Sequence, residues 1–161
     1  MGTYRTAPMD TPARIGTALI SILMVGCAAV GVLVAEMRPL ITVAVLLAVT
    51  AWFSWRIAPK RYEATGEAVV IVRGWPFRDI SIPVSGIREV RRVTLSPWKT
   101  VRTFGVGGLF SYSGRFWARD VGKFYGGVTD FGRAVLIDAG ERYVISPENP
   151  DDFVRDIRVM I

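Results

Sequence analysis

The hydrophobic residues of the chain follow two different patterns, and the change between them comes near Pro59. Before this point, residues 15–35 and 39–55 form two apolar runs that contain no charged residue. As helices that rise about 1.5 Å per residue, they would span roughly 31 and 25 Å, against a hydrocarbon core of about 30 Å. After it, short segments alternate apolar and polar residues, which is typical of half-buried β-strands. The sequence therefore predicts a membrane-embedded first part and a β-rich second part.

The two apolar runs predict a transmembrane helical hairpin over residues 15–57, with helices at 15–35 and 39–57. A secretory signal peptide is the alternative for the first run, but its apolar region would be only about 7–15 residues long. Here the run is longer, and a second one follows at once. The link between the runs is charged and ends at Pro39, which is tolerated in the first turn of a helix. So short a link makes the two helices antiparallel neighbours.

Charged and aromatic residues at the ends of the runs predict the orientation of the hairpin. The second run ends with two tryptophans and is followed by three basic residues, a combination that is typical of a membrane interface: Trp52, Trp55, Arg56, Lys60 and Arg61. The N-terminal side carries Arg5 and Arg14, whereas Arg38 is the one basic residue of the link. By the positive-inside rule, both termini are expected in the cytoplasm. Residues 1–14 would then be a cytoplasmic tail, and residues 62–161 a cytoplasmic domain of a multi-pass protein of the inner cell membrane.

The second part is predicted to contain about seven short strands that form a sandwich or small barrel. The strand-like segments are residues 67–73, 77–82, 87–93, 115–119, 123–129, 134–138 and 142–146. Residues 94–114 are rich in glycine, serine and aromatic residues, and are expected to be mostly a long loop. A short C-terminal helix is expected after Asn149, since Pro150 and two acidic residues follow it. Phe153 would lie on its apolar face, against the β-structure.

Several strings of the second part resemble the bacterial pleckstrin-homology (PH) domains. They are Ile82–Ile87, the glycine-rich Phe104–Gly114, Phe124–Thr129, and Tyr143–Phe153 with its Ser-Pro-x-x-Pro-x-x-Phe ending. With two helices before them, the chain resembles small bacterial membrane proteins in which such a domain follows two transmembrane helices. The resemblance covers about residues 62–160. It implies a seven-stranded barrel capped by a C-terminal α-helix, and a scaffold that binds lipids or proteins rather than a catalytic site.

Composition removes several classes of chemistry. The 161 residues include no histidine, which excludes His-based acid–base catalysis, His-containing triads and His metal sites. A single cysteine excludes an intrachain disulfide and a CxxC zinc site. The net charge of +6 divides into +4 over residues 1–61 (six basic, two acidic) and +2 over residues 62–161 (14 basic, 12 acidic). The domain is therefore not a basic surface for nucleic acid, and neither a cofactor nor a metal site is expected.

The motifs that are left do not predict catalysis. The glycine-rich residues 104–109 lack the Gly-Lys-Ser/Thr of a phosphate-binding loop and the strand–helix setting of a dinucleotide site, so their glycines are interpreted as turn-forming. Asp120 and Asp130 lie near glycines, as turn residues do. No catalytic residue is predicted, and the chain is expected not to be an enzyme. Trp75 and Trp117 are expected to pack in a turn or in the core rather than to form a platform for a ligand.

One segment has an uneven charge. Residues 88–119 hold seven basic residues and one acidic residue, a net charge of +6. The candidates in it for binding a headgroup or a partner are Arg88, Arg91, Arg92, Lys99 and Arg102. With Trp98 and Phe104 they would face anionic headgroups, where each basic residue contributes about 1 kcal/mol; alternatively, they are strand and loop arginines that pair with acidic neighbours. PH domains that bind phosphoinositides use a basic cluster around the first hairpin, which here offers only Arg73 and Arg78.

Three functions follow from these patterns. The first is a non-enzymatic, membrane-anchored scaffold that presents its cytoplasmic domain to another membrane or cytoplasmic protein. The second is an accessory domain that senses anionic lipid headgroups with its basic loop. The third, an enzyme or transporter, lacks an intramembrane charge that would mark a pathway. Membrane lipids are expected partners of the first two, and a homo-oligomer is compatible with both.

Overall fold

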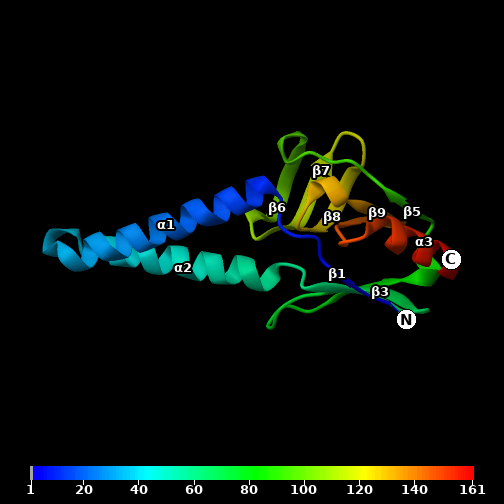
Figure 1. Ribbon diagram of the computed structural model, residues 1–161, viewed down its shortest axis with the longest axis horizontal. Helices are drawn as coiled ribbons and strands as arrows, with labels where there is room; N and C mark the ends of the chain where they lie inside the picture. Colours follow the sequence, from blue (N-terminus) through cyan, green and yellow to red (C-terminus); the bar gives the residue numbers. More distant parts are fainter. Residues whose placement is uncertain (1) are drawn as a thin grey trace.

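In a computed structural model that describes residues 2–161, two long helices project from a β-rich domain (Figure 1). Helices α1 (Thr11–Leu33) and α2 (Pro39–Ile57) are joined by the 3-10 turn Ala35–Met37. Both are long and apolar enough to cross a membrane, with mean hydropathies of 2.3 and 1.8. Only 6% and 11% of their most apolar stretches is buried inside the protein. Because their apolar faces are not covered by the domain, they are not the core helices of a soluble fold.

The two helices approach each other closely at small residues. Gly31 is buried against α2, and a Cβ atom at this position would lie 2.8 Å from the Cγ1 atom of Ile41. Ala44 is the buried small residue of α2 near this contact. Small side chains at such positions allow two backbones to approach in lipid, where the hydrophobic effect does not drive helices together.

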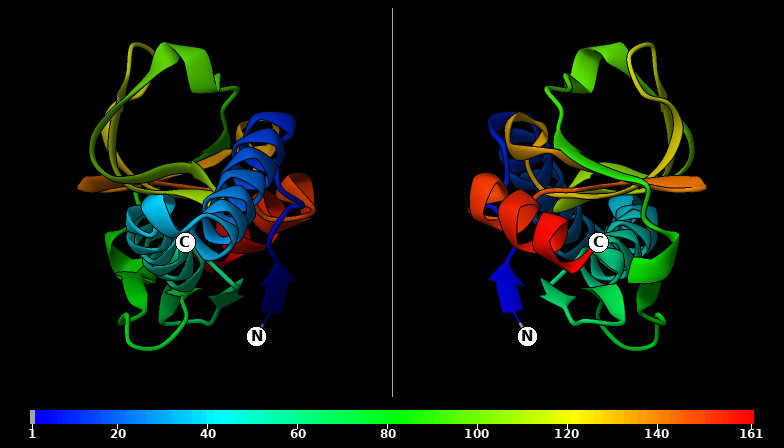
Figure 2. Two further views of the ribbon diagram at one scale, coloured as in Figure 1. Left: turned by 90° about the vertical axis from the view of Figure 1, so that its left-hand side faces the viewer. Right: turned by 90° about the vertical axis from the view of Figure 1, so that its right-hand side faces the viewer.

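The domain consists of two sheets that pack face to face (Figure 2). The first is antiparallel, with the order β1-β2-β3-β4: β1 (Gly2–Arg5), β2 (Arg61–Ala64), β3 (Ala68–Val72) and β4 (Ile80–Pro83). The second has the order β5-β9-β10-β8-β7-β6: β5 (Glu89–Arg92), β6 (Thr100–Leu109), β7 (Ser111–Ala118), β8 (Gly122–Val128), β9 (Val135–Ala139) and β10 (Glu141–Ile145). Its β8–β10 pair is parallel and its other pairs are antiparallel. The seven-stranded barrel that the resemblance implied is therefore wrong: the described residues form ten strands in two open sheets, which is nearer to the sandwich that the strand pattern also allowed.

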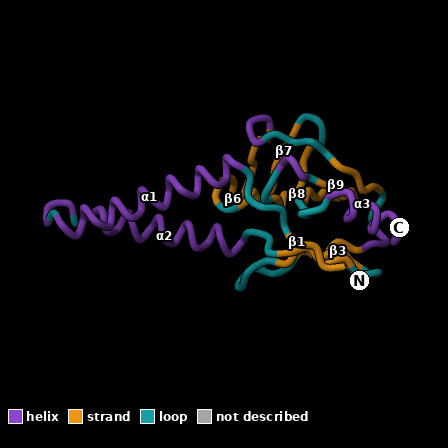
Figure 3. Tube along the Cα trace, in the orientation of Figure 1, coloured by secondary structure: helices purple, strands orange, loops and turns teal. Residues whose placement is uncertain are grey.

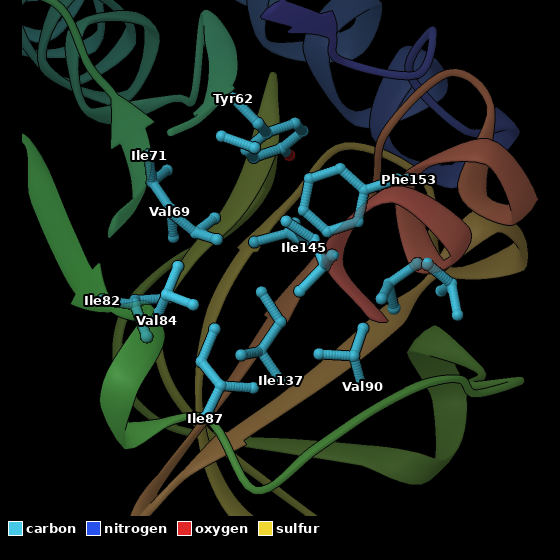
Figure 4. Packing of buried hydrophobic residues seen from close by; sticks show 14 residues of the cluster. Tyr62, Val69, Ile71, Ile82, Val84, Ile87, Val90, Ile137, Ile145 and Phe153 are labelled. Atoms are coloured by element: carbon cyan, nitrogen blue, oxygen red, sulfur yellow. The ribbon is translucent and has the colours of Figure 1, made fainter. Parts of the chain in front are cut away.

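The predicted C-terminal helix is present as α3 (Pro150–Met160) and contributes to the core between the sheets (Figure 4). Phe153 and Ile157 are fully buried there, beside Ile137 and Ile145 of the six-stranded sheet. Tyr62 is also fully buried, and its hydroxyl group donates a hydrogen bond of 2.7 Å to the carbonyl oxygen of Gly127. Burial raises the pKa of Tyr62 to about 12. This polar contact connects the two sheets inside the apolar core.

Strand β6 occupies much of the segment that was expected to be a loop. Its pairing with β7 has register shifts between Arg102 and Phe104 and between Gly107 and Leu109. Gly105 (φ +113°) faces Gly114 (φ +138°), and a Cβ atom on either would lie within 2.3 Å of a carbonyl oxygen of the opposite strand. The glycines therefore permit a close, irregular strand pair instead of a loop.

The segment before α1 is part of the domain and not a free tail. Strand β1 pairs with β2, and the amide of Ala7 donates a hydrogen bond of 2.8 Å to the carbonyl oxygen of Ser146. The ring of Tyr4 packs edge-on against Phe153 at 4.9 Å, and its hydroxyl group donates a hydrogen bond of 2.5 Å to Asp156. Short connections from β1 to α1 and from α2 to β2 thus join both helices to the same sheet (Figure 3).

Candidate membrane-facing surface

Strand β6, the β6–β7 turn and the β3–β4 turn lie at the end of the domain from which α1 and α2 emerge (Figure 1). We call this surface the helix-proximal end. Its side chains come from the end of α2 and the residues after it, from these strands and turns, and from the 3-10 turn Pro97–Lys99 that precedes β6: Trp52, Trp55, Arg56, Lys60, Trp75, Phe77, Trp98, Lys99, Val101, Arg102, Phe104 and Phe110. If the helices cross a membrane, this end is the part of the domain nearest to the lipid headgroups.

The predicted anchors of α2 form one cluster, with the exception of Arg61. The guanidinium of Arg56 lies 5.6 Å from the ring centroid of Trp52 and 5.0 Å from that of Trp55. The ammonium of Lys60 lies 4.2 Å from the Trp55 ring and donates a hydrogen bond of 2.9 Å to the Trp55 carbonyl oxygen. Burial, with the nearby charge of Arg56, lowers the pKa of Lys60. Arg61 is on β2 and pairs instead with Glu63 at 2.6 Å.

The β3–β4 turn packs against the end of α2. Phe77 contacts Phe53 edge-on, with ring centroids 4.8 Å apart. The amide of Gly74 donates a hydrogen bond of 3.0 Å to the Arg56 carbonyl oxygen, which a Cβ atom at Gly74 would approach to 2.9 Å. The adjacent Trp75 is 78% exposed, so the expectation that it packs in the turn is wrong. The turn therefore fixes the domain to α2, and the side chain of Trp75 stays exposed.

The β6–β7 turn makes the corresponding contact with α1. The amide of Phe110 donates a hydrogen bond of 3.2 Å to the hydroxyl oxygen of Thr17. A Cβ atom at Gly16 would lie only 2.7 Å from the carbonyl oxygen of Gly108. Each helix thus has a hairpin turn of the domain packed against it, which gives the domain a defined orientation relative to the helix pair.

Exposed apolar side chains gather on β6 and on the 3-10 turn before it. Trp98 is 88% exposed, Phe104 77% and Val101 56%. Trp117 lies opposite Val101 on β7 and is also exposed, so the expectation that it packs in the core is wrong. Aromatic side chains prefer the interface between water and lipid, where the ring is partly dehydrated and polar atoms stay wet. The sequence pattern missed Trp75, whose place on this surface depends on the packing of the turn against α2.

The five basic candidates do not form one surface. Lys99 and Arg102 lie at the helix-proximal end. Arg91 and Arg92 are on β5, at the opposite edge of the six-stranded sheet, and pair with Glu89 and Asp151, each at 3.0 Å. Arg88 precedes β5, and its side chain lines a separate cleft.

The helix-proximal end has the chemistry of a contact surface. It combines aromatic rings with cations and contains no pair of acidic groups set for proton transfer. Of the two acidic candidates elsewhere, Asp130 accepts a hydrogen bond of 2.8 Å from the amide of Gly132, as a turn residue does. Within residues 2–161, no group of three or more acidic or cysteine side chains is placed to hold a metal ion.

Comparison with protein families gave one match. A family model described as "Bacterial PH domain" matches residues 60–161, which extend from the start of β2 through α3. Searches of the curated proteins and of the solved structures found no match. The matched residues include the sheet strands β2–β10 and the helix whose packing forms the core.

Proposed function

Since the chain belongs to the bacterial PH domain family, we propose that it is a membrane-anchored, non-catalytic binding module. PH domains generally bind lipids or proteins. In this proposal α1 and α2 cross the inner cell membrane, and the domain lies on its cytoplasmic face together with both termini. The helix-proximal end contacts the headgroups and orients the domain, and the rest of the domain is presented to a protein partner.

One observation carries this proposal: exposed aromatic and unpaired basic side chains occur together on elements at the end of the domain from which the helices emerge. Trp75, Trp98 and Phe104 are each more than three-quarters exposed. Lys99 follows Trp98 in the chain and Arg102 is on β6 with Phe104, and neither cation forms an ion pair with any described residue. Aromatic rings and cations together favour a surface of anionic lipid.

The contacts with lipid are proposed to orient the domain rather than to recruit it, because the helices already hold it at the membrane at high effective concentration. In the structure the first hairpin of the matched residues is β2–β3, and the turn that carries Arg73 and Arg78 joins β3 to β4. Recognition of a particular phosphoinositide is not favoured at this turn. The guanidinium of Arg73 is occupied there by the carbonyl oxygen of Arg78 and by the hydroxyl group of Tyr125, the latter at 3.2 Å. Among the described residues, this leaves Arg78 as the one free cation of that turn. A single cation is not enough for the several contacts that a phosphorylated inositol ring needs.

Spin labels in the full-length protein test this docking. In a Cys27→Ala background, Trp75→Cys and Trp98→Cys place a label at the helix-proximal end, and Val159→Cys places one on α3, where the side chain is 84% exposed. The three proteins are reconstituted into nanodiscs that contain phosphatidylglycerol. Collisions with a water-soluble nickel relaxant are then compared between the sites.

We expect the labels at positions 75 and 98 to be shielded from the nickel relaxant, and the label at position 159 to be fully accessible. The shielding at 75 and 98 should decrease when phosphatidylglycerol is replaced by phosphatidylcholine. Equal accessibility at all three positions would contradict membrane docking of the domain.

A further inference from the structure

An open cleft of about 860 Å³ lies where the six-stranded sheet splits between β8 and β10. The parallel pairing of these strands begins only at Tyr125 and Tyr143, so the start of each strand has no partner across the split. Arg142 spans the gap, because its guanidinium donates to the carbonyl oxygen of Val121 and, at 3.3 Å, to the carboxylate of Asp138. The cleft is therefore an opening between two strands of the sheet that Arg142 bridges, with an unpaired strand edge on each side.

Three basic side chains line this cleft without partners of their own. Arg88 comes from the segment before β5, Arg115 from β7 and Lys123 from β8. The side chains of these three residues form no ion pair and no hydrogen bond with another residue of the described chain. Arg142 pairs with Asp138, and the carboxylate of Glu141 accepts a 3.0 Å hydrogen bond from the neutral hydroxyl group of Tyr143. The lining therefore holds four basic and two acidic side chains, a net charge of +2.

We propose that this cleft binds an extended acidic segment of a protein partner. The cations come from three separate elements, an arrangement that suits several carboxylates along a segment better than one compact anion. The unpaired edges of β8 and β10 offer backbone groups, which an extended chain complements by adding a strand. The half-buried ring of Tyr125 adds apolar surface beside the charges, and the cleft ends on the core residues Phe116 and Phe124.

The position of the cleft is compatible with membrane docking, and the proposal rests on the function proposed above. Seen along the helices, the β9–β10 turn (residues 139–141, orange) projects to one side of the helix pair (Figure 2). Asp138, Gly140 and Glu141 of this region line the cleft. The cleft also includes Thr103 of β6, which lies between Arg102 and Phe104 of the helix-proximal end. A partner would therefore approach from the side of the β9–β10 turn while the helix-proximal end contacts lipid.

The test uses full-length protein in phosphatidylcholine nanodiscs and a fluorescein-labelled peptide of alternating glutamate and leucine. Binding is measured by fluorescence anisotropy, and a lysine–leucine peptide is the control probe. We expect saturable binding of the acidic peptide that weakens with added salt. The double variant Arg115→Glu with Lys123→Glu should weaken it by about tenfold, since each exposed charge pair contributes up to about 1 kcal/mol. Arg5→Glu with Arg155→Glu, on β1 and α3, is the charge-matched control and should bind within about twofold of the parent protein.

Two outcomes overturn the inference. One is no saturable binding of the acidic peptide at about 1 mM; the other is equal loss of affinity in the cleft variant and in the control variant. Circular dichroism of each variant establishes that it is folded. Inorganic phosphate that displaces the peptide at micromolar concentration would assign the cleft to a small anion instead. The spin-label result is independent of these readouts, so a failure of the cleft and a failure of membrane docking are distinguishable.

Discussion

Replacement of Phe153 by alanine should destabilise the domain strongly, because this side chain joins α3, the core and the N-terminal strand. The ring is fully buried in the cluster between the two sheets. It also contacts the Tyr4 ring of β1 edge-on, with centroids 4.9 Å apart. The variant loses the transfer free energy of the ring and leaves a cavity that the rigid sheets cannot close.

For such a site, Phe→Ala costs about 3–5 kcal/mol. This is a large share of the roughly 5–15 kcal/mol that stabilises a typical domain. The contact with Tyr4 should appear as a coupling of about 0.5–1.5 kcal/mol in a double-mutant cycle with Tyr4→Ala. Such a coupling would show that Tyr4, which precedes the helical hairpin in the sequence, interacts with Phe153, which follows it.

The measurement is urea unfolding of the full-length protein in detergent micelles, followed by pulse proteolysis of the domain. Val159→Ala is the matched control, since this residue lies on the same helix with its side chain 84% exposed. It should change the free energy of unfolding by less than about 0.5 kcal/mol. A loss below about 1 kcal/mol for Phe153→Ala would refute the packing of α3 described here.

Three further predictions concern the core, the helix contact and the β5 edge. Burial raises the pKa of Tyr62 from 10.0 to about 12, so its neutral form contributes stability that is fully present below pH 10, and roughly 3 kcal/mol should be lost as the pH rises from 10 to 12; Tyr62→Phe should remove this part of the pH dependence in urea titrations. Gly16→Leu places a side chain against the carbonyl oxygen of Gly108, which lies 2.7 Å from the Cβ position, and should therefore increase proteolysis of the β6–β7 turn. Gly26→Leu is the control: this glycine has open space around it, and its replacement should not change proteolysis of the turn. Arg92→Ala removes an exposed ion pair with Asp151 and should change the unfolding free energy by less than about 1 kcal/mol and leave spin-label shielding unchanged.

The sequence predicted those elements whose signal is contained in a continuous stretch. The two long apolar runs became α1 and α2, and the acidic, proline-containing start of the C-terminal segment became α3 with Phe153 buried. The strands after residue 110 were also recognised, because each has its own apolar face. These signals are local and do not depend on which partner each segment meets.

The elements that the sequence did not predict depend on pairing with another strand, distant in the chain for β1 and adjacent for β6. Strand β1 has only four residues and is stable because it pairs with β2, on the other side of the helical hairpin. The glycines of β6 are typical of a loop in the sequence. In the structure Gly105 of β6 and Gly114 of β7 face each other so closely that neither position has space for a side chain.

The composition of the helix-proximal end and of the cleft could not be predicted from the sequence either, because it depends on how the strands pack. The basic segment was continuous in sequence, but the fold separates it, with Lys99 and Arg102 near the helices and Arg92 beside α3. The cleft combines Arg88 with Arg115 and Lys123, which lie on other strands. Charge counted along a segment therefore could not show which cations share a surface.

Cysteine labelling in intact cells tests most directly that the helices span the membrane and hold the domain on its inner face. In a Cys27→Ala background, Glu36→Cys places a thiol in the link between the helices and Val159→Cys places one on the exposed face of α3. A membrane-impermeant maleimide should label position 36 in intact cells and position 159 only after the inner membrane is permeabilised. Labelling of position 159 in intact cells, or of position 36 only after permeabilisation, would contradict this arrangement.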